Sequence, residues 1–398
     1  MFPPPLRRPL DDPTEGGTVD ADEAIRGTDD DALTSRLSAL ALGYIPPSQD
    51  PYTQLFTRSG RMPPLQQIKR APLINVGTHH RSWCVDRLVG RWSEQGGRRQ
   101  VVVLGAGSDA RFWRTGGRAS ERKAKIRPGD EDRGVRTASQ GDLSPIHANL
   151  AKYIEVDFPH ITATKARRIV TKKTLLSAIS PRPEALAAGE KPYNVSQGGT
   201  RLDAEVYHLV PLDLRQQSSQ AGDLLSETLL PLLDPTLPTL FLAECLFCYM
   251  APEESAAIIE WFGNVFGRDG GGGCMGVVYE MCGLDDSFGT VMKRNLMSRG
   301  IPLPGAIYAS PTDQASRFTC AGFDFATGVS LKDIRTQYIP KDELERISKL
   351  EFLDEVEELE LVLDHYCVAW GVKLPSSVRK RVESGEERLE EVVDVGLR

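Results

Sequence analysis

Three acidic residues, Asp109, Asp157 and Glu244, follow or end apolar, strand-like segments, and the first of them lies in a glycine-rich turn. Residues 101–114, VVVLGAGSDARFWR, run from a β-branched segment into a turn of the G-x-G-x-x-[GA] type that contains Asp109. Asp157 ends the strand-like part of KYIEVDFP, and Glu244 lies in TLPTLFLAECLFCYM. Because ligands of parallel α/β sheets bind at the carboxyl ends of the strands, we expect these acids to surround one ligand pocket.

The charges around this turn favour a cationic nucleoside over a dinucleotide. Dinucleotide-binding turns leave a helix N-terminus free for the pyrophosphate, and Asp109 would place a second anion there. Asp157 lies further from the turn than the usual distance of about 20 residues, because a polar insert intervenes. The pattern indicates a methyltransferase that uses S-adenosylmethionine rather than a dehydrogenase. Two plainer interpretations stay open: Asp109 interacts only with the helix dipole, and Glu244 pairs with a basic side chain.

Other kinds of chemistry find little support in the composition and motifs. The net charge of −7 argues against a nucleic-acid partner, and there is neither a G-x-S-x-G nor an H-E-x-x-H motif of hydrolases. Cys245 and Cys248 form a C-x-x-C inside an apolar run, which predicts buried thiols and no metal site. With no signal peptide and no apolar run of 18 residues, we expect a protein inside the cell that does not span a membrane.

The elements that must position these residues alternate between strands and helices from residue 101 to residue 283. This alternation predicts a parallel, doubly wound sheet, with YCVAWGV (366–372) as its final edge strand. The acidic stretch DELERISKLEFLDEVEELELVLDHY is strongly helical in pattern. The expected regions are a disordered tail (1–22), a helical region (23–98), a core (99–372) with polar inserts at 115–148 and 179–201, and a charged tail (373–398).

Taken together, six segments resemble the leucine carboxyl methyltransferases, which methylate the C-terminal leucine carboxylate of the protein phosphatase 2A catalytic subunit. In chain order they are IRGTDDDA, LGAGSDARFWR, YIEVDFP, LDL, AECLFCYMAPEES and KLEFLDEVEELELVLDHYCVAW. The resemblance implies a Rossmann-like, class I S-adenosylmethionine-dependent methyltransferase fold. That fold has a mostly parallel, doubly wound sheet, an antiparallel edge strand and an N-terminal helical lid over the cofactor.

The resemblance also implies roles for individual residues. Asp157 would hold the ribose hydroxyls and Glu244 would face the amino group of the cofactor. Arg81 would pair with the cofactor carboxylate, and Tyr249 would lie near the substrate, so these two are the catalytic candidates. Arg36 stands where the family has a lysine and keeps the charge but not the shape. The implied cofactor-binding residues are Arg36, Arg81, Gly105, Gly107, Asp157, Asp213, Leu214 and Glu244, with Asp213 and Leu214 flanking the adenine.

The function that the resemblance implies is transfer of a methyl group to the phosphatase tail, forming an ester that regulates phosphatase holoenzyme assembly. A carboxylate is already ionised at pH 7, so no general base is required. The resemblance further implies a monomer in the cytoplasm, with the nucleus as a second location. Two alternatives stay open: a related methyltransferase that acts on a small-molecule carboxylate or hydroxyl, or one that acts on a modified tRNA base.

Overall fold

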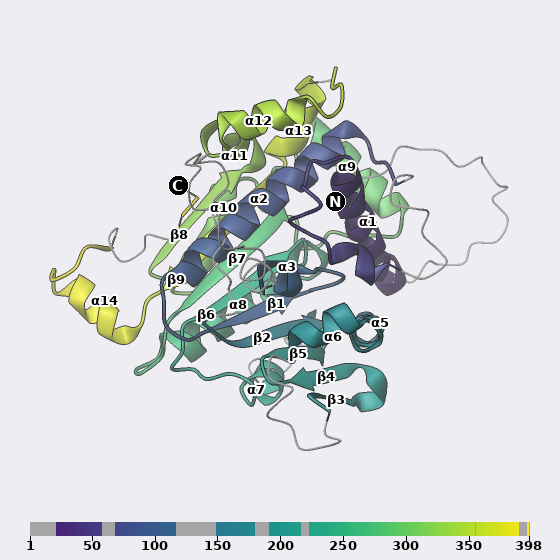
Figure 1. Ribbon diagram of the computed structural model, residues 1–398. Coiled ribbons are helices and arrows are strands. Elements are labelled where there is room, and N and C mark those ends of the chain that lie inside the picture. The colour runs from purple at the N-terminus through teal and green to yellow at the C-terminus, as the bar shows by residue number, and fades with distance from the viewer. Residues whose placement is uncertain are drawn as a thin grey trace, which may run out of the picture.

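One nine-stranded sheet organises the part of the chain that the structure describes (Figure 1). The computed structural model describes residues 21–57, 68–116, 149–179, 191–215, 223–354, 356–389 and 396–397. The strand order is β3-β4-β5-β2-β1-β6-β7-β9-β8. The strands are β1 (Arg99–Leu104), β2 (Leu150–Asp157), β3 (Tyr193–Ser196), β4 (Arg201–Ala204), β5 (Tyr207–Pro211), β6 (Thr239–Glu244), β7 (Cys274–Met281), β8 (Phe325–Ser330) and β9 (Tyr366–Lys373).

The middle of the sheet is parallel and doubly wound. Strands β5, β2, β1, β6 and β7 pair in parallel, whereas β3 with β4, β4 with β5, β9 with β7 and β8 with β9 are antiparallel. The chain passes from β1 to β2 on one side and later returns to β6 on the other, so the winding reverses between β1 and β6. The predicted Rossmann-like fold is confirmed, and its ligand position lies at this reversal.

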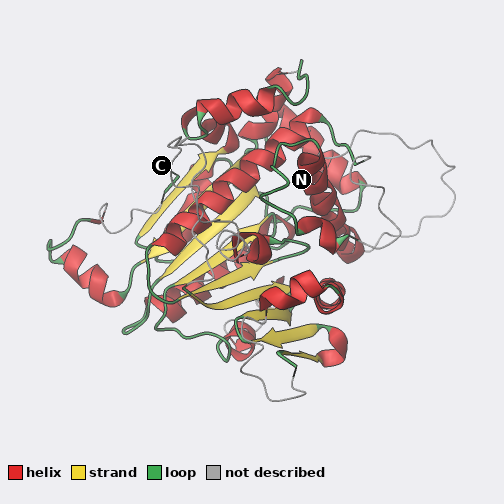
Figure 2. Ribbon diagram, viewed as in Figure 1, coloured by secondary structure: helices red, strands yellow, loops and turns green. Residues whose placement is uncertain are grey.

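Helices cover both faces of the sheet (Figure 2). Several begin with proline, including α2, α5 and α8, where the missing proline N–H has no helical partner to lose. The helices are α1 (Ala21–Ala41), η1 (Thr53–Phe56), α2 (Pro72–Glu94), α3 (Arg111–Gly116), α5 (Pro159–Thr171), α6 (Lys173–Ile179), η5 (Gln197–Gly199), α7 (Asp223–Leu229), η7 (Phe247–Tyr249), α8 (Pro252–Gly267), α9 (Ser287–Ser298), α10 (Pro311–Cys320), α11 (Leu331–Gln337), α12 (Lys341–Ser348), α13 (Val356–Asp364) and α14 (Ser376–Glu383).

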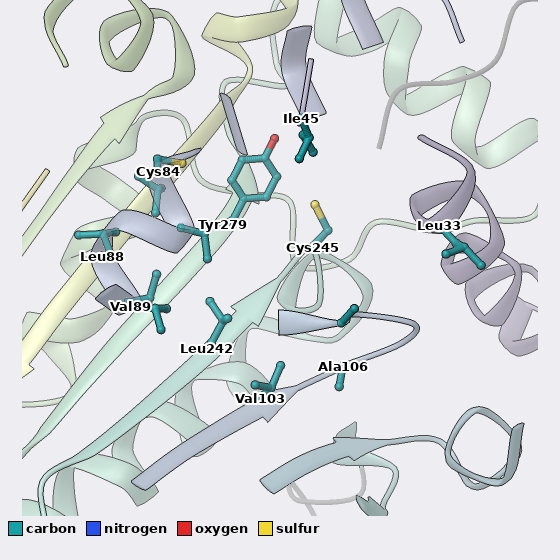
Figure 3. Close-up of a cluster of buried hydrophobic side chains, with 14 of the residues drawn as sticks. Leu33, Ile45, Cys84, Leu88, Val89, Val103, Ala106, Leu242, Cys245 and Tyr279 are labelled. Carbon is teal, nitrogen blue, oxygen red and sulfur yellow. The ribbon is translucent and has the colours of Figure 1, made fainter. Parts of the chain in front are cut away.

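Alternating residues of each central strand enter two separate hydrophobic clusters, one on each face of the sheet. On one face, Leu242 of β6 and Val103 of β1 belong to the same cluster as Leu88 of α2 (Figure 3). On the other face, Phe241 stacks on Phe262 of α8 with ring centroids 4.3 Å apart. The two clusters hold β1 and β6 rigidly, so the turns that leave these strands have fixed starting points.

Two elements differ from the sequence-based expectation. Residues 366–372 form β9 as predicted, but β9 is not an edge strand, because β8 pairs with its outer side. β8 is mostly half-buried and contains Gly328, so its sequence lacks the apolar run that marks the central strands. The acidic helical stretch is two helices, α12 and α13, separated by residues 349–355.

The polar inserts are described only in part. Residues 193–204 form the antiparallel hairpin of β3 and β4, although their first part falls in the predicted insert at 179–201. Residues 1–20, 117–148, 180–190 and 390–395 lie outside the described residues, and so do the predictions made for them. Among the described helices, none is long and apolar enough to cross a membrane.

Candidate active site

Two adjoining cavities lie at the carboxyl ends of β1, β2, β5 and β6, and together they are called the sheet-edge pocket here. The larger cavity is bounded by α1, α2, the glycine turn and the ends of β2 and β6, and the smaller one extends toward the end of β5. Both include Gly105, Asp157 and Tyr249 in their walls. All nine predicted site residues line this pocket: Arg36, Arg81, Gly105, Gly107, Asp157, Asp213, Leu214, Glu244 and Tyr249.

The glycine turn needs glycine for two reasons. Gly105 and Gly107 have φ of +63° and +46°, which L side chains rarely adopt. A Cβ at Gly105 would lie 2.9 Å from Cδ1 of Leu246, and one at Gly107 would lie 2.5 Å from Oδ1 of Asp29. The close neighbours of the turn are therefore protein groups, and Asp29 of α1 reaches into the pocket directly over it.

Asp157 ends β2 and accepts two backbone hydrogen bonds. The N–H of Gly107 donates to Oδ2 at 2.7 Å, and the N–H of Phe158 donates to Oδ1 at 2.7 Å. Burial, together with the nearby charge of Asp29, raises the pKa of Asp157 to about 6 despite these bonds. At neutral pH the residue is thus an ionised acceptor in the pocket wall, held beside the glycine turn.

Glu244 ends β6 between two arginines that come from different helices. Nε of Arg81 in α2 donates to Oε2 at 2.7 Å, and Nη2 of Arg111 in α3 donates to Oε1 at 2.8 Å. Burial alone would raise the pKa of Glu244, but Arg111 and Arg81 lower it to about 2. The interpretation that Glu244 pairs with basic side chains is confirmed, and the paired carboxylate still forms part of the pocket wall.

Arg111 ties together the acids on its side of the pocket. Its side chain is only 3% exposed, and it donates to Oδ2 of Asp109 at 2.6 Å and to Oδ1 of Asp86 at 3.0 Å. Arg114 also contacts Asp86. Asp109 lines the pocket, but its charge is already compensated by Arg111, so it contributes less negative potential than the sequence suggested.

Arg36 and Arg81 line the larger cavity, as do Arg26 and Arg111. Nε of Arg36 donates to Asp50 at 2.6 Å, and its Nη1 donates to Ser82 of α2 at 2.9 Å. The guanidinium of Arg81 also lies over the ring of Tyr279, 4.8 Å from its centroid. Arg36 and Arg81 are each held by a fixed partner, and both side chains line the same cavity, which suits recognition of a carboxylate.

The smaller cavity combines apolar walls with two acids, Asp157 and Asp213. Asp213 and Leu214 follow β5, and Phe158 also lines the cavity. Arg215 donates from Nη2 to Asp213 at 2.7 Å, and its guanidinium lies 5.0 Å from the centroid of the Phe158 ring. An aromatic and aliphatic wall with carboxylate acceptors suits a purine base with an amino group.

The segment that carries Tyr249 is held by Glu280 of β7. Cys245, the first residue after β6, has φ of +52°, a strained conformation for a residue with a side chain. Oε1 of Glu280 accepts hydrogen bonds from the N–H groups of Leu246 at 2.9 Å and Phe247 at 2.7 Å. Cys245 and Cys248 are buried, as predicted. Burial raises the pKa of Tyr249 well above its usual value, so its hydroxyl stays a neutral donor.

Replacing Glu280 by alanine is expected to loosen this segment. The change leaves two buried N–H groups without an acceptor next to a strained residue, which lowers the free energy of unfolding by about 2–4 kcal/mol. Urea unfolding of the variant measures this loss. Glu280→Gln keeps an acceptor oxygen and is the matched control, expected to retain most of the stability. Equal losses of stability in both variants would show that the charge of the Glu280 carboxylate matters, and not its hydrogen bonds from the N–H groups of Leu246 and Phe247.

Sequence reasoning missed the partners that hold the predicted residues in place. Asp29 is the first of three consecutive aspartates, and only its position on the face of α1 that meets the glycine turn distinguishes it from the other two. Arg111 directly follows the glycine turn, but nothing in the sequence pairs it with Asp86, 25 residues away in α2. Tyr279 lines the pocket from β7, next to Glu244 in the sheet register, and had no sequence signal beyond its position near a strand end.

These contacts indicate which nucleoside cofactor the pocket suits. A pyrophosphate would need free N–H groups in the glycine turn, but Gly107 donates to Asp157 and Ser108 donates its N–H to Asp29 at 2.6 Å. The larger cavity instead combines half-buried acids with several arginines, among them Arg36 and Arg81. A cofactor with a cationic sulfur, an amino group and a carboxylate matches that combination. Fold and site together define a class I methyltransferase that depends on S-adenosylmethionine.

Comparison with known proteins specifies the family. A leucine carboxyl methyltransferase family profile matches residues 28–124 and 146–263. Leucine carboxyl methyltransferase 1 of Cryptococcus neoformans (strain JEC21) is 48% identical over 373 residues, which cover 89% of this chain and 94% of that protein. The Aspergillus fumigatus protein of the same name is 34% identical, over 89% of this chain and 84% of that protein. The Bos taurus protein of that name is 31% identical, over 92% of this chain and 95% of that protein.

Among solved structures, the chain is similar to the S-adenosylmethionine-dependent methyltransferase SibL in its apo form. The identity is 11% and the TM-score 0.36, over 85% of this chain and 70% of that one. The sequence relatives decide the assignment: the chain belongs to the leucine carboxyl methyltransferase family. It is an enzyme of that class.

Proposed function

We propose that this enzyme transfers a methyl group from S-adenosylmethionine to the α-carboxylate of the C-terminal leucine of the protein phosphatase 2A catalytic subunit. The observation that carries the proposal is the pair of fixed arginines, Arg36 and Arg81, in one cavity with Glu244 and Asp157. The arginines are suited to carboxylates, and the acids are suited to a cationic nucleoside. Family membership adds the leucine carboxylate as the acceptor.

Each part of the cofactor has a residue of suitable chemistry in the pocket. Asp157 would accept hydrogen bonds from the ribose hydroxyls, and Asp213 with Leu214 would hold the adenine. Glu244 would face the amino group, and Arg81 would pair with the cofactor carboxylate. When bound, the cofactor supplies an activated methyl group on a positively charged sulfur. The protein has to hold the acceptor oxygen in line with that methyl group.

The acceptor side of the reaction calls for orientation and removal of water rather than for a base. The leucine carboxylate is ionised at neutral pH, and no side chain has to remove a proton from it. Tyr249 and Tyr279 line the pocket with neutral hydroxyls, because burial raises both pKa values well above the usual range. These hydroxyls, with Arg36, would hold the carboxylate oxygen that does not react. Closing α1 over the pocket would exclude water and strengthen these interactions.

Transfer of a labelled methyl group tests the proposal directly. The enzyme is incubated with radiolabelled S-adenosylmethionine and purified phosphatase 2A catalytic subunit, either intact or lacking its last leucine. We expect label only on the intact subunit, released by mild base because the product is an ester. Label on neither protein, with the cofactor bound, would redirect the search to small-molecule carboxylates or hydroxyls and to modified tRNA bases.

The remaining parts of the proposal concern the surroundings of the reaction. We infer that the enzyme acts as a monomer in the cytoplasm, with the nucleus as a second location, and that methylation regulates assembly of the phosphatase holoenzyme. Size-exclusion chromatography with light scattering tests the monomer. Holoenzyme assembly is tested by comparing regulatory-subunit binding to methylated and unmethylated phosphatase.

A further inference from the structure

Asp29 connects α1 to the glycine turn through two hydrogen bonds. Its Oδ1 accepts from the backbone N–H of Ser108 at 2.6 Å, and its Oδ2 accepts from the Ser108 hydroxyl at 2.8 Å. All of these groups lie in the wall of the larger cavity. α1 approaches the turn so closely here that even a methyl group on Gly107 would collide with the Asp29 carboxylate.

A second contact connects the start of α1 to the adenine side of the pocket. Arg215 donates from Nη1 to Asp22 of α1 at 2.6 Å and from Nη2 to Asp213 at 2.7 Å. The same guanidinium covers the ring of Phe158. Arg215 therefore joins α1 to a residue that the proposed function assigns to adenine binding.

Other ion pairs of α1 have partners outside the glycine turn. Asp31 pairs with Arg299 at the end of α9, at 2.5 Å, and with Arg70 at 3.2 Å. Arg36 pairs with Asp50. Asp29 differs from these residues because its partner belongs to the glycine turn itself. A rearrangement of α1 that opened the pocket at the turn would have to break the two Asp29 bonds.

We propose that Asp29 is a positioning residue that latches α1 to the glycine turn through Ser108 and thereby controls how fast the cofactor enters and leaves. Asp22 and Arg215 form the second latch, on the adenine side. The proposal rests on the proposed function only for the identity of the cofactor. In both latches a carboxylate accepts hydrogen bonds, from Ser108 or from Arg215, and such charge-assisted bonds are stronger than bonds between neutral groups and yet reversible.

Cofactor exchange measured without protein substrate tests the latch. The dissociation rate of S-adenosylmethionine from the full-length enzyme is measured by dilution of radiolabelled cofactor into unlabelled excess. Asp29→Ala removes both bonds and is expected to raise that rate by about 10- to 100-fold. Ser108→Ala keeps the backbone N–H and is expected to raise it by only about 2- to 5-fold. The dissociation rate of the variant with both Asp29→Ala and Ser108→Ala should not exceed that of Asp29→Ala alone, because the two residues act as one unit.

A matched control and a stability readout separate positioning from structure. Glu23→Ala removes an exposed acid from the same helix and should leave the dissociation rate unchanged. Asp29→Asn, which keeps one acceptor oxygen, should fall between wild type and Asp29→Ala. A lower melting temperature with an unchanged dissociation rate in both Asp29 variants would overturn the latch. Failure of the wild-type enzyme to bind the cofactor at all would overturn the proposed function as well.

Discussion

Replacing Glu244 by alanine is expected to lower the affinity for S-adenosylmethionine by about 100-fold or more. The change removes the carboxylate that both Arg81 and Arg111 contact. Arg111 keeps Asp109 and Asp86 as partners, whereas the half-buried guanidinium of Arg81 loses the carboxylate with which it pairs. The carboxylate that would face the cofactor amino group is lost as well, and truncating one partner of such a charge pair costs about 2–5 kcal/mol of affinity. The two arginines would also oppose a cofactor with a positively charged sulfur and an ammonium group. Isothermal titration calorimetry with the cofactor alone measures the loss.

Glu244→Gln is the matched comparison for the charge. Glutamine keeps the size of the side chain and one acceptor oxygen, but it cannot serve both arginines equally or face an ammonium group as an anion. We expect an affinity between those of wild type and alanine. If glutamine bound the cofactor as tightly as wild type, Glu244 would act through shape and hydrogen bonding alone. If alanine did so, Glu244 would not belong to the cofactor site.

The positions of the predicted acids at one edge of the sheet could be inferred from sequence because they follow from strand topology. Asp157 and Glu244 end strands with clear apolar runs, and parallel strands bring such ends to one edge of the sheet. Both residues line the sheet-edge pocket. The glycine turn was recognisable for a similar reason, since its two positive φ values call for glycine after a strand.

The charge pairing around these acids was not predictable in the same way. Whether Asp109 faces a ligand or a neighbour depends on where Arg111 points, and that depends on Asp86 and on the packing of α2 against the sheet. Such contacts arise only in the tertiary structure. The sequence therefore predicted the acids of the pocket wall, but not how far arginines such as Arg111 compensate their charge, and it overestimated the part that Asp109 plays.

The elements at the two ends of the sheet show a second limit of sequence patterns. β8 is mostly half-buried, so it lacks the apolar signal of a central strand, and β9 was consequently expected at the edge. The β3–β4 hairpin did have a local signal, since Gly198 and Gly199 turn the chain with positive φ between two short segments. Its polar composition outweighed that signal and suggested an insert without strands.

Asp157 is expected to make cofactor binding depend on pH in a defined direction. Burial and the nearby Asp29 raise its pKa to about 6, above the usual value near 4. Below pH 6 the carboxyl is protonated and loses acceptor capacity toward the ribose hydroxyls. The apparent affinity for S-adenosylmethionine should thus be constant above about pH 7 and fall roughly tenfold per pH unit well below pH 6. Calorimetric titrations between pH 5 and pH 8 measure this profile.

Stability should change in the opposite sense over part of the same range. The folded-state pKa of Asp157 lies above its unfolded value, so the folded state binds the extra proton between about pH 4 and pH 6. The contribution of Asp157 to the free energy of unfolding is therefore present at low pH and is lost as the pH rises through 6. Burying the ionised carboxylate thus lowers the stability of the cofactor-free enzyme at neutral pH, at the place where the ribose hydroxyls would donate hydrogen bonds to it.

Asp157→Asn separates these two effects in one variant. The amide cannot ionise, so the fall in affinity near pH 6 should disappear, and the affinity at pH 8 should be about 10- to 100-fold lower than in wild type. The rise in stability between pH 7 and pH 5 that Asp157 contributes should disappear too. An unchanged affinity at pH 8 would remove Asp157 from the ribose site. A persistent step near pH 6 would assign the titration to another group, and Glu155 is the nearest candidate, since burial raises its pKa to about 7.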